Sequence, residues 1–449
     1  MPAVKPGGYS RLVTLAEMQQ KISTGDISSV ELIVRTIQRI DKHNPSMNAF
    51  IETFFEKALA EARLAEQRIL QKNARPLEGI PLTIKDSLDI AGSPTHCGSL
   101  LNRELRPAHD ATSVSLLREA GAIIVGKTSC PEFLMNYETD NRIIGRTNNP
   151  WDEGRTAGGS SGGEAAAIAA GLSAGGVGSD GGGSIRVPAH FCGICGLKPT
   201  PGRIPSTGHF PKSGGPFALL GVVGPMARTV ADLRLLFRVM EGWDDGDPCA
   251  APVQVRELHE KETFGMGVGF FTEDGRTPVT AETRAAVERA AGTLLNEGFR
   301  VEPFRPDGLD EARELWWKLF GIAGGMILGP MVRGREAELS PILREFISWT
   351  PAGNPEESAH TGESLLSTWL RRDGLREHIL RQMRKYPVLI CPPAAIPAFR
   401  HGEREWQVEG KSVKYLDAWS YCEWFNLLGF PAAVVPAGYS EDGLPIGVQ

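Results

Sequence analysis

One stretch decides the fold of this chain: residues Gly158 to Thr200 read GGSSGGEAAAIAAGLSAGGVGSDGGGSIRVPAHFCGICGLKPT. A glycine-rich turn that holds Ser160 comes first, and a second glycine run, 181–183, leads into Ser184. Glycine tolerates positive φ and lets other groups approach the backbone closely. Several N–H groups can therefore point to one place beside Ser184, where they would stabilise an oxyanion.

Regular elements are expected on either side of these turns. The Ala-rich segment 164–170 predicts a tightly packed helix, with Ser160 and Ser161 near its N-terminus. Residues 174–179 predict a short buried strand, and 184–191 predict the start of another helix.

Lys85 is a third candidate of chemical interest. Apolar residues alternate along 79–86, which predicts a strand with Lys85 at its end. A lysine next to an acid such as Asp86 is ordinarily a solvated surface residue. Burial at the end of an apolar strand would instead lower the lysine pKa toward that of a usable base.

These motifs, GIPLTIKD and GGSSGGE…GSDGGGSIRVPAHFCGICGLKPT, resemble the amidase-signature hydrolases over most of the chain. The resemblance implies a Ser–cisSer–Lys triad with Ser184 as nucleophile, Ser160 as bridging serine and Lys85 as base. It also implies a cis peptide bond before Ser160, which the double-glycine turn permits. Backbone N–H groups are expected to form the oxyanion hole, from Gly181, Gly182, Gly183 and Ser184.

The resemblance and the periodicities predict an α/β fold, a large twisted mixed β-sheet covered by helices. We expect a single domain over residues 1–449. Its N-terminal helices are expected in 1–75, a catalytic core in 79–200, and a variable helical region over the substrate cleft in 305–400.

Several further elements can be placed by pattern. Capping boxes at Thr14-x-x-Glu17 and Ser28-x-x-Glu31 predict the first two helices. A strand–helix–strand pattern over 266–304 predicts an extension of the parallel sheet. Residues 388–391 and 432–436 are expected to be late strands returning to that sheet.

Composition narrows the function classes. A net charge of −6 gives no support for nucleic-acid binding. The sequence has no run of about 18 apolar residues, so no membrane span is predicted. The N-terminus lacks the apolar core of a signal peptide. Seven cysteines in a chain of this length predict reduced thiols and cytoplasmic residence. We expect a monomer or homodimer.

Neither a metal nor a cofactor is expected. The histidines show no metal-site spacing, and Cys192-x-x-Cys195 lacks a second ligand pair at zinc spacing. Residues 121–128, GAIIVGKT, formally match a phosphate-binding loop. Their apolar centre predicts a strand where the flexible loop should be, which argues against nucleotide binding.

The predicted reaction is hydrolysis of amide-like C–N bonds through a serine acyl-enzyme. Substrates are expected to be small amides, anilides, carbamates or esters, as for an aryl acylamidase or a urethanase. Met135 and Tyr137 are candidate substrate contacts, and the tryptophans of 309–401 favour an apolar cleft. Two alternatives stay open: the amidase subunit of a tRNA-dependent amidotransferase, and a non-catalytic or phosphate-binding relative.

Overall fold

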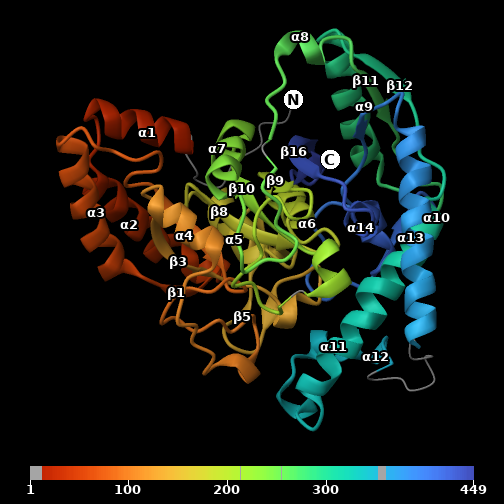
Figure 1. Ribbon diagram of the computed structural model, residues 1–449, viewed down its shortest axis with the longest axis horizontal. Coiled ribbons are helices and arrows are strands. Elements are labelled where there is room, and N and C mark those ends of the chain that lie inside the picture. Colours follow the sequence, from red (N-terminus) through yellow and green to blue (C-terminus); the bar gives the residue numbers. More distant parts are fainter. Residues whose placement is uncertain (1–12, 213, 254, 352–360) are drawn as a thin grey trace.

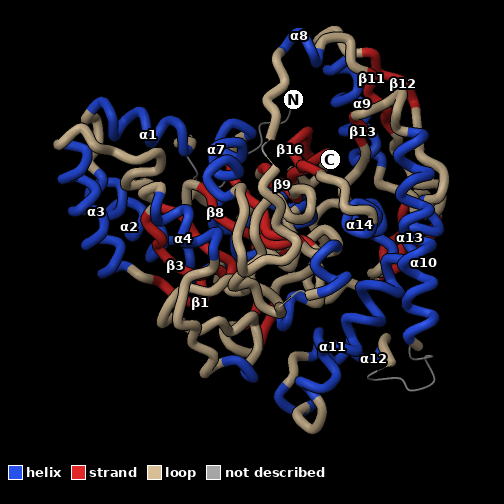
Figure 2. Tube along the Cα trace, viewed as in Figure 1, coloured by secondary structure: helices blue, strands red, loops and turns tan. Residues whose placement is uncertain are grey.

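An eight-stranded mixed sheet lies at the centre of the computed structural model, which describes residues 13–212, 214–253, 255–351 and 361–449 (Figure 2). In spatial order its strands are β1 (Phe50–Thr53), β3 (Ile123–Thr128), β2 (Pro81–Lys85), β8 (Gly175–Asp180), β10 (Val222–Ala227), β9 (Cys195–Lys198), β16 (Ala432–Tyr439) and β17 (Pro445–Val448). The predicted mixed α/β fold is therefore confirmed.

Three neighbouring strands of the sheet are parallel, and its central strands are buried. Strands β3, β2 and β8 run parallel to one another, whereas every other neighbouring pair is antiparallel. Every residue of β2, β3, β8 and β10 is buried. Strands buried on both faces need helical cover above and below, and the helices supply it.

The N-terminal helices form one side of the molecule (Figure 1). They are α1 (Leu15–Thr24), α2 (Ser29–Met47) and α3 (Phe55–Leu70). The predicted capping box is present in α1, where the Thr14 hydroxyl accepts from the Glu17 N–H and the Thr14 N–H donates to the Glu17 side chain. Ser28 caps α2 by accepting from the Glu31 N–H. Residues 1–12 of the predicted helical segment lie outside the described residues.

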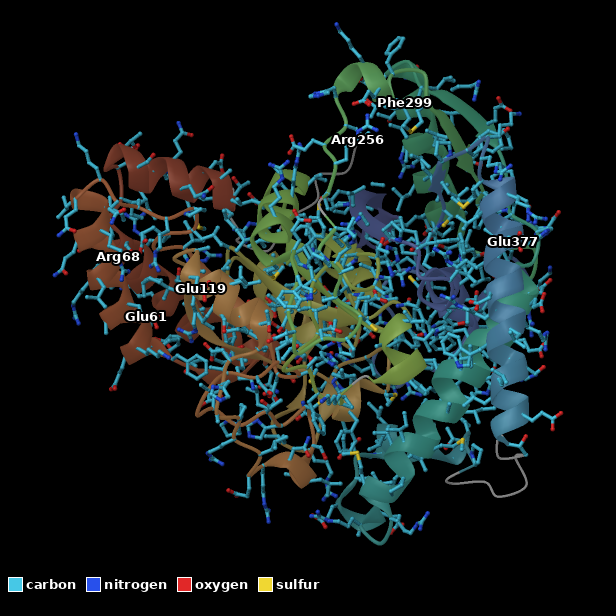
Figure 3. All side chains as sticks on the ribbon, in the orientation of Figure 1. Glu61, Arg68, Glu119, Arg256, Phe299 and Glu377 are labelled. Atoms are coloured by element: carbon cyan, nitrogen blue, oxygen red, sulfur yellow. The ribbon has the colours of Figure 1, made fainter. Side chains whose placement is uncertain are left out.

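The helices beside the sheet are α4 (Thr112–Glu119), α5 (Gly162–Ala169), α6 (Arg186–Cys192), α7 (Val230–Met240) and α14 (Ser420–Leu427). The short elements are α8 (Glu260–Thr263), β4 (Asp140–Asn141), β5 (Gly145–Arg146), β6 (Asn148–Asn149), β7 (Asp152–Thr156), β14 (Glu405–Val408) and β15 (Lys411–Lys414). Glu61 and Arg68 on α3 lie far across the molecule from Glu377 on α13 (Gly362–Gln382) (Figure 3).

The strand–helix–strand pattern over 266–304 does not extend the main sheet, and this prediction was wrong. Strand β11 (Gly267–Phe270), helix α9 (Ala281–Asn296) and strand β12 (Arg300–Pro303) form a separate parallel sheet with β13 (Val388–Ile390), in the order β12-β11-β13. Strand β13 was likewise expected in the main sheet, and only β16 returns there. The antiparallel β16–β17 pair already occupies that edge.

The variable region consists of α10 (Leu309–Trp316), a π-helical turn (Trp317–Ile322), α11 (Ala323–Val332), α12 (Pro341–Ser348) and α13 (Gly362–Gln382). Part of this region, 352–360, lies outside the described residues. Among the residues described, one helical stretch, Leu309–Val332, is long and apolar enough to cross a membrane by length and composition alone. Its most apolar window is 56% buried inside the protein, as core helices often are.

Candidate active site

Lys85 lies at the end of β2 and is fully buried. Its Nζ donates to the hydroxyls of Ser160 at 2.8 Å, Ser161 at 2.9 Å and Ser179 at 3.1 Å. The structure thus brings together Lys85 and Ser160, as predicted. Sequence reasoning gave no role to Ser161 and Ser179, although they directly follow Ser160 and precede Asp180 at the end of β8.

The peptide bond between Gly159 and Ser160 is cis, which confirms the prediction made from the resemblance. The turn packs closely on a neighbouring loop. A Cβ at Gly159 would lie 2.8 Å from the Asn136 carbonyl oxygen and 2.8 Å from the Glu138 nitrogen. Glycine is therefore required at this position for steric reasons.

Ser184 stands beside this turn, at the end of the second glycine run. The Ser161 N–H donates to the Ser184 carbonyl oxygen at 3.0 Å, which ties the two serine turns together. Ser160 and Ser184 line one cavity. The three residues assigned from the motif therefore share one site.

The glycine loop before Ser184 has N–H groups in two different situations. The Gly183 N–H donates to Asp180 Oδ1 at 2.8 Å, so this donor is already satisfied inside the protein. For the N–H groups of Gly181, Gly182 and Ser184, no acceptor within hydrogen-bond reach is found in the described part of the chain. Gly183 was among the predicted oxyanion donors, but its N–H is already hydrogen-bonded and is not available to an oxyanion.

Two aromatic side chains hold the carbonyls of the same loop. Trp316 Nε1 donates to the Gly181 carbonyl at 3.0 Å, and the Tyr137 hydroxyl donates to the Gly182 carbonyl at 3.0 Å. Both contacts fix the orientation of the peptide groups, and with it the direction of the N–H groups. Tyr137, a candidate substrate contact, thus also braces the loop.

Asp180 and Arg186 form a buried ion pair, with 3.0 Å between Arg186 Nη2 and Asp180 Oδ1. Burial acts to raise the pKa of Asp180, but the Arg186 guanidinium outweighs it, so the pKa is lowered. The carboxylate also accepts from the Ile185 N–H at 3.0 Å. The Asp180 carboxylate therefore holds the glycine loop 181–183 in place through hydrogen bonds to its backbone.

Burial lowers the pKa of Lys85 to about 8, although nearby thiols and the carboxyls of Asp180 and Glu164 act to raise it. The adjacent Asp86 does not pair with Lys85. Its Oδ1 lies 2.8 Å from the Nζ of Lys127 on β3. The lysine is consequently surrounded by hydroxyl groups, and its neutral form is accessible near neutral pH.

Glu164 is a buried carboxyl that sequence reasoning did not single out. It lies on α5 and accepts hydrogen bonds from the hydroxyls of Thr83 on β2 and Thr128 on β3, the latter at 2.6 Å. Burial raises its pKa to about 7. A Cβ at Gly176 would lie 2.0 Å from Glu164 Oε1, so the glycine-rich strand β8 is what lets this carboxyl approach.

The cavity at Ser160 and Ser184 encloses about 800 Å³ of empty space, part of it open to solvent. Its walls are mostly apolar and include Phe133, Met135, Phe217, Phe320, Ile327 and Leu328. Phe320, from the aromatic region 309–401, and Met135, a candidate substrate contact, both line this cavity. Tyr137 lines a smaller cavity that also reaches Ser184.

Two other chemistries weighed from the sequence, metal binding and phosphate binding, can be compared with the described residues. In the described ranges, no group of three or more His, Cys, Asp or Glu side chains could hold a metal ion. Residues 126–128 form the end of β3, and Lys127 pairs with Asp86, so GKT is not a phosphate-binding loop. Cys192 and Cys195 are buried free thiols.

Comparison with known proteins identifies the family. The Amidase family model matches residues 31–449. The chain belongs to the amidase signature family, whose enzymes hydrolyse C–N bonds.

The similar proteins include both an amidotransferase subunit and an aryl acylamidase. The A subunit of the glutamyl-tRNA(Gln) amidotransferase from Chloroflexus aurantiacus is 34% identical over 476 aligned positions, covering 97% of this chain and 92% of the relative. A solved structure from a vestigial complex linked to the origins of an s-triazine catabolic enzyme has TM-score 0.87 and 30% identity, covering 97% of this chain and 94% of that one. A bacterial aryl acylamidase has TM-score 0.84 and 26% identity, covering 97% and 91%.

Proposed function

We propose that this protein is a serine amidase that cleaves small amide-like substrates through an acyl-enzyme. The observation that carries the proposal is the contact between Lys85 Nζ and Ser160 Oγ at 2.8 Å, in a buried site where the neighbouring carboxylate Asp86 is paired elsewhere. A buried lysine without a carboxylate partner can lose its proton and act as a base.

The reaction follows from this arrangement. Neutral Lys85 takes the proton of Ser160, and Ser160 takes the proton of Ser184 as the Ser184 oxygen attacks the carbonyl carbon. The N–H groups of Gly181, Gly182 and Ser184 can donate to the oxyanion, and losing one such donor typically costs about 3 kcal/mol. Ser160 then returns a proton to the leaving nitrogen, and water hydrolyses the acyl-enzyme.

The apolar walls of the cavity favour aryl or alkyl substituents over small polar ones. Anilides and alkyl amides are therefore the proposed substrates. Carbamates and esters are open to the same attack, because their carbonyl carbons react with a serine oxygen in the same way. The similarity to an aryl acylamidase supports this choice.

A second candidate is the amidase subunit of a tRNA-dependent amidotransferase, which the identity to the Chloroflexus aurantiacus relative favours. Such a protein would release ammonia from glutamine and would work with partner chains. The two functions separate when the purified chain is assayed alone with glutamine and with an acetanilide. Anilide turnover by the chain alone would favour the first candidate, and a chain that is inactive alone on both substrates would favour the second, which requires partner chains.

Ser184→Ala tests the proposed nucleophile directly. We expect the variant to lose hydrolysis of an activated anilide while keeping the thermal unfolding curve of the wild type. An exposed serine on α1, changed in Ser23→Ala, is the matched control. Turnover by Ser184→Ala above the level of a mock preparation would remove Ser184 from the mechanism.

The proposal also covers the cellular compartment and the oligomeric state of the protein. All seven cysteines are unpaired, which supports residence in a reducing compartment such as the cytoplasm. We expect a monomer or homodimer for the small-substrate amidase, and a requirement for partner chains for the second candidate. Size-exclusion chromatography with light scattering measures the mass of the purified chain.

A further inference from the structure

The three candidate oxyanion donors belong to peptide groups whose carbonyls are bound by different parts of the fold. A peptide group is planar, and in the trans form its C=O and N–H point in opposite directions. The peptide bonds of the loop 181–184 are trans. A side chain that binds the carbonyl of one residue therefore sets the direction of the N–H of the next residue.

Two of the three donors are oriented by helices beside the main sheet. The carbonyl in the same peptide group as the Gly181 N–H accepts from Asn426 Nδ2, on α14, at 2.9 Å. The carbonyl in the same peptide group as the Ser184 N–H accepts from the Val187 N–H, on α6, at 2.7 Å. Both donors are thus oriented without the variable region.

The third donor, the Gly182 N–H, is oriented from the variable region. The Gly181 carbonyl accepts from Trp316 Nε1 at 3.0 Å, and in the described part of the chain Trp316 is its one hydrogen-bond donor. Trp316 is the last residue of α10 and is 4% exposed. The indole holds the carbonyl side of this peptide group, so the N–H points away from the ring.

The next peptide group along the loop obeys the same geometry. The Tyr137 hydroxyl donates to the Gly182 carbonyl at 3.0 Å, and on the opposite side the Gly183 N–H donates to Asp180 Oδ1 at 2.8 Å. This group is bound on both sides and has no free N–H. Tyr137 therefore orients no oxyanion donor, whereas Trp316 does.

The Trp316 indole is itself packed in place. The Phe320 ring stacks on it, with 5.0 Å between the ring centroids and 14° between the planes. A Cβ at Gly182 would lie 2.5 Å from Trp316 Cζ2, and a Cβ at Gly181 would lie 2.5 Å from Phe320 Cε2. The two rings therefore lie directly against the two glycines, and the hydrogen bond to Gly181 is formed by a side chain with little freedom to rotate.

We propose that Trp316 is a positioning residue of the reaction, which aims the Gly182 N–H at the oxyanion. It acts through the Gly181 carbonyl rather than on the substrate. The variable region then does more than cover the cleft, because it supplies one of the contacts that orient the oxyanion donors in advance. The inference rests on the proposed function, in which the oxyanion forms beside Ser184.

Trp316→Phe tests this role, because it removes the indole N–H and keeps an aromatic ring against Phe320. We expect kcat for an anilide to fall by roughly tenfold, less than the roughly 100-fold that outright loss of an oxyanion donor costs. KM should stay within about twofold, since the donor acts on charge that develops only in the transition state. A loss confined to KM would overturn the proposal.

Trp151→Phe is the matched control. Trp151 Nε1 also donates to a backbone carbonyl, that of Cys192, at 2.9 Å, and Trp151 lines neither of the two cavities at Ser184. Its kcat should stay within about twofold of the wild-type value. Equal losses of kcat in the two variants would overturn the proposal, because they would show that removing any such indole N–H loosens the protein.

A second replacement covers the case in which Trp316→Phe does not fold. Benzothienylalanine at position 316 puts sulfur in place of the indole N–H and keeps the size of the ring pair. The same fall in kcat is expected for this protein. An unchanged kcat in either folded protein would contradict the role of Trp316.

An inhibitor separates positioning from general damage. A trifluoromethyl ketone adds the Ser184 oxygen at its carbonyl carbon, the Ser184 proton passes through Ser160 to Lys85, and the ketone oxygen becomes the oxyanion. In Trp316→Phe the dissociation constant of the ketone should rise by about the factor by which kcat/KM falls. The corresponding alcohol, which cannot add the serine, should bind as it does to the wild type. Equal weakening of both ligands would overturn the proposal.

These outcomes are distinct from those that test the proposed function. Anilide turnover with an unchanged kcat in Trp316→Phe would overturn the positioning role alone. Ketone binding that Trp316→Phe weakens, in a protein that turns over no anilide, would keep the role of Trp316 and overturn the proposed amidase function. A wild type that does not bind the ketone would overturn both.

Discussion

Replacing Lys85 with methionine would measure how strongly the fold opposes the charge of this side chain. Its pKa is about 8 in the folded protein, against 10.5 for an ordinary lysine. Between these values the unfolded chain binds more protons than the folded one, so the free energy of unfolding rises with pH. From about pH 7 to about pH 10, the two pKa values correspond to a gain of about 2.5 kcal/mol.

Methionine has a similar length and no charge, so the variant should lack this pH-dependent gain. The measurement is the difference in unfolding free energy between wild type and Lys85→Met, from urea denaturation at the two pH values. The lost hydrogen bonds to Ser160 and Ser161 are absent at both pH values and largely cancel. A difference that stays constant from about pH 7 to about pH 10 would refute the reasoning.

The same pKa predicts the pH dependence of the reaction. About one Lys85 in eleven is neutral at about pH 7, and about nine in ten at about pH 9, so kcat/KM for an anilide should rise about tenfold. The profile should show a single acid limb with its midpoint near the lysine pKa. Lys85→Arg cannot deprotonate and should be nearly inactive. An acid limb of equal height in Lys85→Met would identify another base.

Three further substitutions probe the surroundings of the triad. Gly181→Ala would place its Cβ 2.5 Å from the Phe320 ring, so kcat/KM for an anilide should fall by about tenfold and recover in part with Phe320→Leu; no recovery would exclude this clash as the cause. Glu164→Gln removes a carboxyl that raises the pKa of Lys85, so the midpoint of the pH–rate profile should move to lower pH; an unmoved midpoint contradicts this. Asp180→Asn leaves Arg186 buried without its counter-charge, and urea denaturation should show a loss of about 3–5 kcal/mol; wild-type stability would show that the pair is dispensable.

The sequence predicted the main elements of the site because its signals are local. Glycine turns, an alternating strand and a long motif placed Lys85, Ser160 and Ser184 without any knowledge of the sheet. In the structure, the parallel pairing of β2 and β8 places Lys85 beside Ser179, and the turn before α5 brings Ser160 to 2.8 Å from the Lys85 Nζ.

What the sequence could not predict depends on contacts between distant segments. Glu164 lies in an Ala-rich run that signals only a packed helix, and its role emerges once β2 and β3 present Thr83 and Thr128 to it. The separate parallel sheet is a similar case. Periodicity indicated β11, α9 and β12, but the choice of sheet depended on which strand already occupied the edge of the larger one.

Two buried lysines at the ends of neighbouring strands show how strand geometry separates a base from a structural cation. Side chains along a strand alternate between its two faces, so Lys85 and the next residue, Asp86, project in opposite directions. Lys127, on the adjacent strand β3, forms an ion pair with Asp86, with 2.8 Å between its Nζ and Asp86 Oδ1. Its Nζ also donates to the Pro94 carbonyl at 2.7 Å. Lys127 therefore has a carboxylate and a backbone carbonyl as acceptors. Lys85, on the opposite face, has the three serine hydroxyls, which stabilise its charge far less than a carboxylate does. Lys85 and Asp86 are adjacent in sequence and resemble a surface ion pair. Because their side chains point in opposite directions, Asp86 pairs with Lys127 and Lys85 has no carboxylate partner.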